Sequence, residues 1–174
     1  MAKQLIVITL LSNDQPGIVQ QLANIISSHN GNWLESRMSQ LAGKFAGILK
    51  VSIDSAQTQA LTDSLKQLTG EGIQILVESS NDIELSQGYS LTFELVGGDR
   101  IGIVNEISQA FAETGINIDE METHCSSMPW SGEPLFEAKG SLHAPAGIDM
   151  NKLMDQLDAI EEKLGIDLTL STTL

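Results

Sequence analysis

The sequence predicts an α+β protein built from two βαββαβ domains, each a four-stranded antiparallel sheet with two helices on one face. The prediction rests on an internal repeat at a spacing of 85 residues, and on strand-like and helix-like apolar patterns that recur in the same order in both copies. A polar stretch between the copies suits a connecting segment. We therefore expect domain 1 at residues 1–80, a linker at 81–88 and domain 2 at 89–174.

The repeat is clearest around a turn that precedes a helix-like pattern. When the chain is shifted by 85 positions, residues 13–19 (Asn-Asp-Gln-Pro-Gly-Ile-Val) fall on residues 98–104 (Gly-Asp-Arg-Ile-Gly-Ile-Val). From position 13 to position 37, six of the 25 pairs are identical. About one or two identities are expected from average residue frequencies. Two copies of one domain therefore account for most of the chain.

Each copy shows the same predicted order of elements, which is that of the ferredoxin-like fold. In copy one, strands are expected at 5–10, 32–41, 44–53 and 73–78, and helices around 18–26 and 61–68. In copy two, strands are expected at 89–96, 117–124, 135–144 and 167–172, and helices around 103–111 and 153–164. Pro16 suits the first position of a helix, Asn30-Gly31 and Gly115 suit helix ends, and Ala42-Gly43 suits a tight hairpin turn.

Charge and composition limit the classes of partner. The net charge is −14, with eight acidic and five basic residues in 1–85 but fifteen and four in 86–174. Nucleic-acid binding depends on Lys and Arg contacts with phosphates, so direct binding to DNA is not expected. No apolar run reaches the roughly 18 residues that span a membrane. The single cysteine, Cys125, excludes an internal disulfide and fits a cytoplasmic protein.

The turn motif carries a resemblance to a known family. Residues 14–19 read Asp-x-Pro-Gly-Ile-Val inside a βαββαβ unit and resemble the first turn of ACT domains. Copy two keeps the Asp, Gly, Ile and Val but has Ile101 where Pro is common. Two such domains in tandem resemble the glycine cleavage system transcriptional repressor family. This resemblance implies a regulatory protein that senses glycine or a similar amino acid between paired domains. It also implies indirect control of glycine cleavage genes, through binding to a LysR-type activator protein.

Physical chemistry explains why such a turn could bind an amino acid. The first turn of a helix leaves backbone N–H groups unpaired, and a carboxylate is stabilised there. Gly17 and Gly102 allow close approach to the backbone, while Asp14 or Asp99 could accept hydrogen bonds from an ammonium group. The predicted ligand-binding residues are Asn13, Asp14, Gly17, Ile18, Val19, Asn32, Asp99, Arg100, Gly102, Ile103, Val104 and Asn117.

These residues also have structural alternatives. Asp14 and Asp99 could cap the helix or the turn. The glycines could serve close packing of helix against sheet, and Asn32 and Asn117 could end the turn after the helix. These alternatives stay open at the level of sequence.

The two copies differ most between their second and third strands. Copy two inserts residues 126–134, which include Trp130, a candidate for partner contact because Trp is common at interface hot spots. The alternative is that Trp130 folds back over the sheet. His124 and Cys125 point to opposite faces of a strand, so we expect no metal site and a small buried Cys125.

Catalysis is not expected, because the sequence has no nucleophile elbow, phosphate-binding Gly-rich loop or zinc-binding HExxH pattern. No cofactor is expected either. The enzyme alternative is an acyl-phosphate hydrolase on a ferredoxin-like fold, for which Arg100 would be the phosphate-binding cation. A further alternative is a ligand-independent adaptor or scaffold. Unpaired edge strands also make a homodimer a reasonable expectation.

Overall fold

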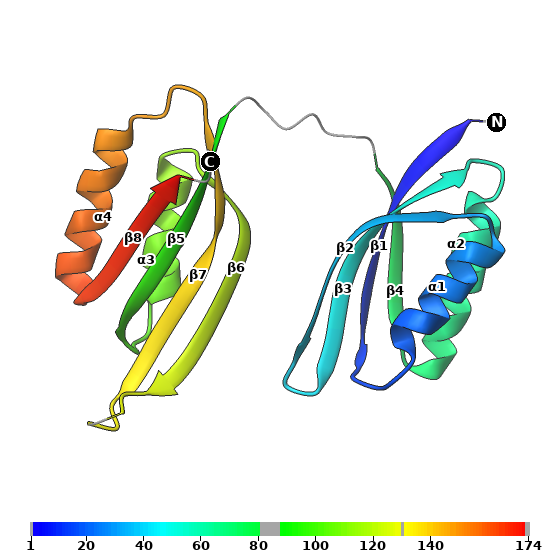
Figure 1. Ribbon diagram of the computed structural model, residues 1–174, viewed down its shortest axis with the longest axis horizontal. Coiled ribbons are helices and arrows are strands. Elements are labelled where there is room, and N and C mark those ends of the chain that lie inside the picture. Colours follow the sequence, from blue (N-terminus) through cyan, green and yellow to red (C-terminus); the bar gives the residue numbers. More distant parts are fainter. Residues whose placement is uncertain (1, 81–87, 130, 173–174) are drawn as a thin grey trace. The chain divides into compact units, whose positions relative to one another are not determined.

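The computed structural model describes residues 2–80, 88–129 and 131–172. The chain divides into two compact units, residues 1–84 (unit 1) and 85–174 (unit 2). Each unit has the predicted βαββαβ order (Figure 1). The predicted linker at 81–88 lies outside the described residues, apart from Gly88, which begins the first strand of unit 2.

Unit 1 is a four-stranded antiparallel sheet with both long helices on one face (Figure 1). Its elements are β1 (Lys3–Asn13), α1 (Ile18–Ser28), β2 (Asn32–Leu41), β3 (Lys44–Asp54), α2 (Thr58–Gln67), the short 3₁₀ helix η1 (Leu68–Glu71) and β4 (Gln74–Ser80). The strand order across the sheet is β2-β3-β1-β4, which places the first and third strands at the centre.

Unit 2 repeats this topology with the strand order β6-β7-β5-β8. Its elements are β5 (Gly88–Gly98), α3 (Ile103–Glu113), β6 (Asn117–Ser127), β7 (Pro134–Pro145), α4 (Met150–Leu164) and β8 (Ile166–Thr172). The predicted fold class and order of elements are therefore confirmed in both units. Several strands extend a few residues beyond their predicted limits.

The two units have a register shift and a left-handed residue at positions 85 residues apart. The pairing of the second strand with the third shifts register between Trp33 and Glu35 in unit 1 and between Ile118 and Glu120 in unit 2. The first helix is followed by a left-handed residue in each unit, Asn30 with φ 57° and Gly115 with φ 77°. Asn and Gly are the residues that tolerate this conformation best, which explains the predicted helix ends.

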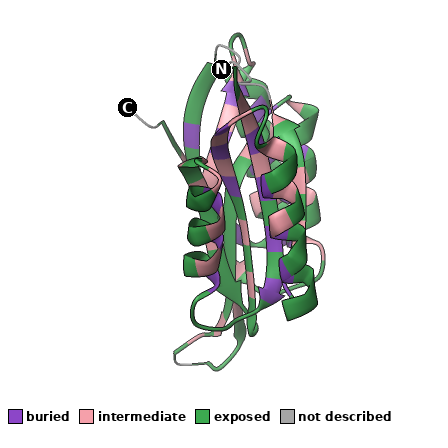
Figure 2. Cartoon of the chain, turned by 90° about the vertical axis from the view of Figure 1, so that its right-hand side faces the viewer, coloured by how far each residue is buried: buried purple, intermediate pink, exposed green. Residues whose placement is uncertain are grey.

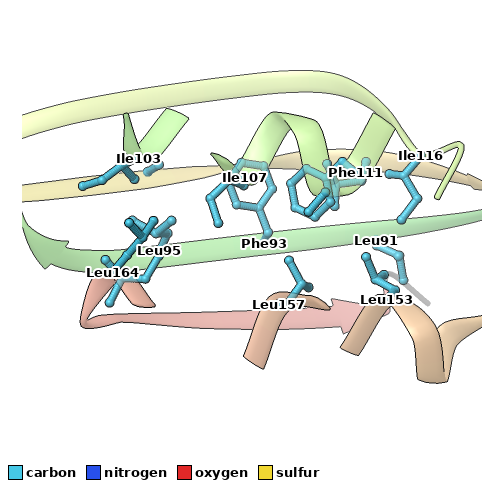
Figure 3. Close-up of a cluster of buried hydrophobic side chains, with 14 of the residues drawn as sticks. Leu91, Phe93, Leu95, Ile103, Ile107, Phe111, Ile116, Leu153, Leu157 and Leu164 are labelled. Atoms are coloured by element: carbon cyan, nitrogen blue, oxygen red, sulfur yellow. The ribbon is translucent and has the colours of Figure 1, made fainter. Parts of the chain in front are cut away.

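Each unit has its own hydrophobic core between its helices and one face of its sheet. Figure 2 shows the buried residues on the strands and on the helix surfaces that face them. In unit 1 the central core residues are Ile6, Ile8, Leu10, Leu22, Ile26, Leu49, Val51, Leu61 and Leu65. In unit 2 the core is built around Phe93 and Phe111 (Figure 3). The opposite face of each sheet carries no helix from the described part of its own unit.

Two local expectations were wrong. Pro16 lies in the turn before α1 rather than in its first helical position, because Gly17 is the N-cap and the helix begins at Ile18. Cys125 is exposed rather than buried. It lies on β6, an edge strand of its sheet, two residues before the strand ends.

None of the described helices has both the length and the apolarity needed to cross a lipid bilayer.

Candidate functional site

The predicted turn of unit 1 lies where β1 ends and α1 begins, and it is fastened to the neighbouring hairpin. The backbone N–H of Asp14 donates to the carbonyl oxygen of Gly43, at 2.9 Å. Gly17 has φ 97°, and its carbonyl oxygen accepts the first helical hydrogen bond from the N–H of Gln21, at 2.9 Å. The Asp14 side chain is exposed at this end of the sheet. The turn is thus a fixed structure with its polar groups facing solvent.

The turn of unit 2 is built in the same way. The backbone N–H of Asp99 donates to the carbonyl oxygen of Pro134, at 3.0 Å, and Gly102 has φ 105°. The N–H of Glu106 donates to the carbonyl oxygen of Gly102, also at 3.0 Å. A shallow hollow over the start of α3 is bordered by this turn and by Phe136 of β7. The two turns therefore present the same backbone arrangement.

Neither turn supports the capping alternative for the aspartates. The N-cap of α1 is Gly17 and that of α3 is Gly102, and neither helix has a side-chain hydrogen bond at its cap within the described residues. In contrast, the carboxylate of Asp149 caps α4 by accepting from the N–H of Lys152, at 3.1 Å. The first-turn N–H groups of α1 and α3 are therefore open to an external acceptor.

The glycines are required by conformation rather than by close packing. A Cβ atom placed on Gly17 or Gly102 would have no heavy atom within 4 Å, apart from its own neighbours along the chain. Their φ angles of 97° and 105° lie in the left-handed region, which other residues adopt at a cost. The same open space leaves room for a ligand beside the backbone.

The hydrophobic residues of the motif divide into two roles. Ile18 and Ile103 are buried in the cores, so their contribution to a ligand site would come from the backbone. Val19 and Val104 are 45% and 41% exposed and lie beside the open helix ends. Their side chains can line a ligand site.

Asn32 and Asn117 are not brought together with the turns of their own units. Asn32 pairs with Ser52, which pairs with Leu5, whereas Asn13 at the turn pairs with Lys44. The eight residues from position 5 to position 13 of β1 correspond to about 26 Å. In unit 2, Asn117 pairs with His143 and so lies level with Ser90, again eight residues before Gly98. Each asparagine is thus at the opposite end of its sheet.

Lysine 44 is a neighbour of the unit 1 turn that the sequence reasoning missed. Its ammonium group donates to Oδ1 of Asn13, at 2.6 Å, because β3 begins directly opposite the end of β1. The Ala42-Gly43 turn predicts that β3 starts at Lys44. Placing Lys44 opposite Asn13 also requires the register of β3 against β1, which the sequence pattern does not give. Lys44 brings a positive charge to the end of the sheet that carries the turn.

In unit 2 the corresponding cation is Arg100, which lies within the turn itself. One of its guanidinium nitrogens, Nη2, would be 3.9 Å from a Cβ atom built on Gly165, the residue that ends α4. The carboxyl end of a helix attracts positive charge, which favours this orientation. The two turns thus each have a cation, supplied by different elements.

Other sequence-based candidates give no site. Trp130 lies outside the described residues, so its predicted partner contact stays a prediction. Around it, the hairpin loop is closed by the N–H of Met128 donating to the carbonyl oxygen of Glu133, at 2.8 Å. Among the residues that the structure describes, no group of three or more His, Cys, Asp or Glu side chains could hold a metal ion.

Comparison with known proteins matches the first unit to a family. Residues 4–78 match the sequence model of the ACT domain family. A curated relative is the phosphoserine phosphatase SerB2 of Mycobacterium tuberculosis (strain ATCC 25618 / H37Rv), which is 28% identical over 123 residues. These residues are 68% of this chain but 30% of that protein, so the chain spans less than a third of the length of this relative.

Two solved structures are similar to this chain over almost its whole length. An unknown protein from Galdieria sulphuraria is 25% identical, with a TM-score of 0.90 over 99% of this chain and 100% of that one. A proposed glycine cleavage system transcriptional repressor is 17% identical, with a TM-score of 0.70 over 99% of both chains. At this low identity the second likeness shows the fold, which is the tandem arrangement of two such domains.

Proposed function

We propose that this chain is a non-enzymatic regulatory protein that senses a small amino acid such as glycine. Its first unit matches the ACT domain family, and its second unit repeats the same fold. The observation that carries the proposal is the pair of uncapped helix ends. Both α1 and α3 begin at a left-handed glycine beside open space, with a carboxylate, Asp14 or Asp99, in the same turn. The unit 1 turn lies within the matched ACT family segment, residues 4–78.

The proposed binding mode uses both ends of the ligand. The ligand carboxylate would accept hydrogen bonds from the first-turn N–H groups of α1 or α3, with Lys44 or Arg100 contributing positive charge. Its ammonium group would donate to Asp14 or Asp99. Asn13, Val19 and Val104 would border the ligand. Asn32 and Asn117 could reach it only from a domain other than the one whose turn holds it.

We further propose that the chain controls transcription of glycine cleavage genes through a protein partner, a LysR-type activator. The likeness in fold to a proposed glycine cleavage repressor supports this class of function. The net charge of −14 disfavours direct contact with DNA, so a protein partner is the better candidate. Trp130 is proposed as part of the partner contact.

The experiment for the sensing function is a thermal-shift panel of the twenty amino acids. A ligand at 100 times its dissociation constant should stabilise the folded chain by about 2.7 kcal/mol, or roughly 5–10 °C at this size. Loss of the shift in Asp14→Ala or Asp99→Ala would assign it to unit 1 or unit 2. If no amino acid shifts the melting temperature at millimolar concentration, a ligand-independent adaptor becomes the better account.

The partner proposal has its own measurement. The chain would be titrated into a purified LysR-type activator of glycine cleavage genes, with and without 10 mM glycine, and with Trp130→Ala as the variant. A complex whose affinity changes with glycine supports the regulatory role. A chain that binds the activator equally well at both glycine concentrations acts without sensing.

A further inference from the structure

The face of the unit 1 sheet that is turned away from its helices carries an apolar strip. On β1, the residues between the buried Ile6, Ile8 and Leu10 point to this face: Leu5, Val7, Thr9 and Leu11. Strand pairing places Ile48 on one side of Thr9 and Leu76 on the other. Leu11, Ile48 and Leu76 are 44%, 50% and 56% exposed. These residues form a continuous strip across β3, β1 and β4, which we call the open face of unit 1.

The same positions in unit 2 show that the fold does not require an apolar surface there. At the corresponding positions of β5, Leu5, Val7 and Thr9 are replaced by Ser90, Thr92 and Glu94, whereas Leu11 has an apolar counterpart in Val96. The positions equivalent to Ile48 and Leu76 are Lys139 and Thr169, because these residues pair with Glu94 as Ile48 and Leu76 pair with Thr9. Since one unit folds with a polar open face, the apolar side chains of the other serve contact with something outside that unit.

We propose that the open face of unit 1 binds the same face of a second copy of this chain, forming a two-fold symmetric dimer of packed sheets. The size of the face supports this occupant. With β2 included, the sheet face that carries this strip has four strands at about 4.8 Å spacing and about eight residues at 3.3 Å each, or roughly 500 Å² per copy. Two copies would therefore bury on the order of 1,000 Å², which reaches the size of a specific interface.

Charged residues of both signs lie on the open face of unit 1. At one end, Glu35 and Glu78 lie in the same row as Lys50, and Arg37 of the next row has its guanidinium 3.9 Å from the Glu35 carboxylate. At the other end lies Lys44, whose ammonium contacts the uncharged amide of Asn13. The six residues between Lys44 and Lys50 correspond to about 20 Å. Since both signs of charge occur along this length, a second copy does not meet a face of a single charge.

Unit 2 could not dimerise in this way through its own open face. That face carries Glu94, Glu122 and Glu137 around a single lysine, Lys139, which pairs with Glu122 at 3.2 Å. Two copies of this surface would place like charges opposite one another, which is unfavourable. Self-association is therefore assigned to unit 1.

Sedimentation equilibrium of the full chain tests the proposal. Leu76→Glu introduces a charge into the apolar strip of the proposed interface, and Thr169→Glu introduces the same charge at the equivalent exposed position of unit 2. We expect a wild-type dimer, a dissociation constant raised at least tenfold by Leu76→Glu, and a change of less than twofold for Thr169→Glu. Because Leu76 is 56% exposed, circular dichroism and the melting temperature of the monomer should stay unchanged.

Three outcomes would overturn the proposal. A wild-type chain that stays monomeric up to about 100 µM would mean that the open face is covered by something other than a second copy. A dimer that Leu76→Glu leaves intact would place the contact elsewhere, for example along a sheet edge. Equal weakening by Leu76→Glu and Thr169→Glu would indicate general charge repulsion rather than contact through unit 1.

Discussion

Unit 1 and unit 2 share a backbone plan yet fill their cores differently. Ile8 of β1 lies opposite Leu49 of β3, and Ile26 of α1 completes this part of the unit 1 core. At the equivalent positions unit 2 has Phe93 opposite Gly140, and Phe111 on α3. The two rings pack with centroids 5.6 Å apart (Figure 3). Two phenylalanines and a glycine in unit 2 thus replace three aliphatic residues of medium size.

The comparison shows which features the repeat keeps. The left-handed glycine, the bulge in the second strand and the hydrogen bond that fastens the turn occur in both units. Core side chains differ in a set that compensates in volume, and open-face residues differ in polarity. Backbone conformations that few residues can adopt constrain the sequence more strongly than buried volume, which several combinations can fill. The preserved turns are therefore explained by backbone conformation, and they are also where we propose the shared ligand site.

The largest expected effect concerns the space beside Phe93. In Gly140→Ala the new Cβ would clash with the backbone oxygen of Glu120, and Phe93 would be only 2.7 Å away. We expect a loss on the order of 3 kcal/mol in the stability of unit 2, measured by urea denaturation. Gly98→Ala is the control, since a Cβ there meets no heavy atom within 4 Å, and it should change stability by less than about 0.5 kcal/mol. Equal losses from both variants would contradict the packing account.

The next effect tests whether the two turns are equivalent. Gly17→Ala and Gly102→Ala should each cost about 1–2 kcal/mol, because both positions have positive φ. Gly70→Ala, at a glycine outside the left-handed region with open space around it, should be neutral or slightly stabilising. Thermal denaturation of the three variants checks this. A cost at only one of the two turns would break the proposed equivalence of the units.

A smaller effect is expected for ligand affinity. Asp14→Asn and Asp99→Asn remove the negative charge from one turn each while keeping the shape of the side chain. Each should weaken glycine binding at its own turn by about tenfold, or 1.4 kcal/mol, as measured by calorimetry. If only one variant has an effect, one unit senses and the other has kept the turn for its structure.

The smallest effect concerns the contact between each first helix and the second half of its unit. In unit 1, Gln21 donates to a carboxylate oxygen of Glu71, at 3.1 Å. In unit 2, the equivalent residue Glu106 pairs with Lys163, at 2.6 Å, with 31% and 61% of the two side chains exposed. Lys163→Gln should cost less than about 1 kcal/mol, and the difference should shrink at 0.5 M NaCl. A cost that does not depend on salt would indicate lost packing instead.

Periodicity and the repeat were enough to predict the fold. Turn residues such as Gly115 and Gly43 marked element ends, because glycine is the residue that adopts left-handed backbone most readily. Lys44 could not be placed at the turn, since a strand's register depends on contacts distant in sequence. By contrast, the sequence pattern was enough to predict that Asn32 lies at the opposite end of the sheet from the turn. A helix that packs back along the sheet must return the chain to the end where the first strand began.

The central claim is that this tandem of ACT folds binds a small amino acid, and titration calorimetry of the wild-type chain with glycine tests it most directly. The account predicts saturable heat that disappears in the Asp14→Ala, Asp99→Ala double variant, while that variant keeps its melting temperature in the absence of ligand. Binding unchanged in the double variant would contradict the proposed site. No heat with glycine, or with alanine or serine as its nearest relatives in size, would contradict the sensing function itself.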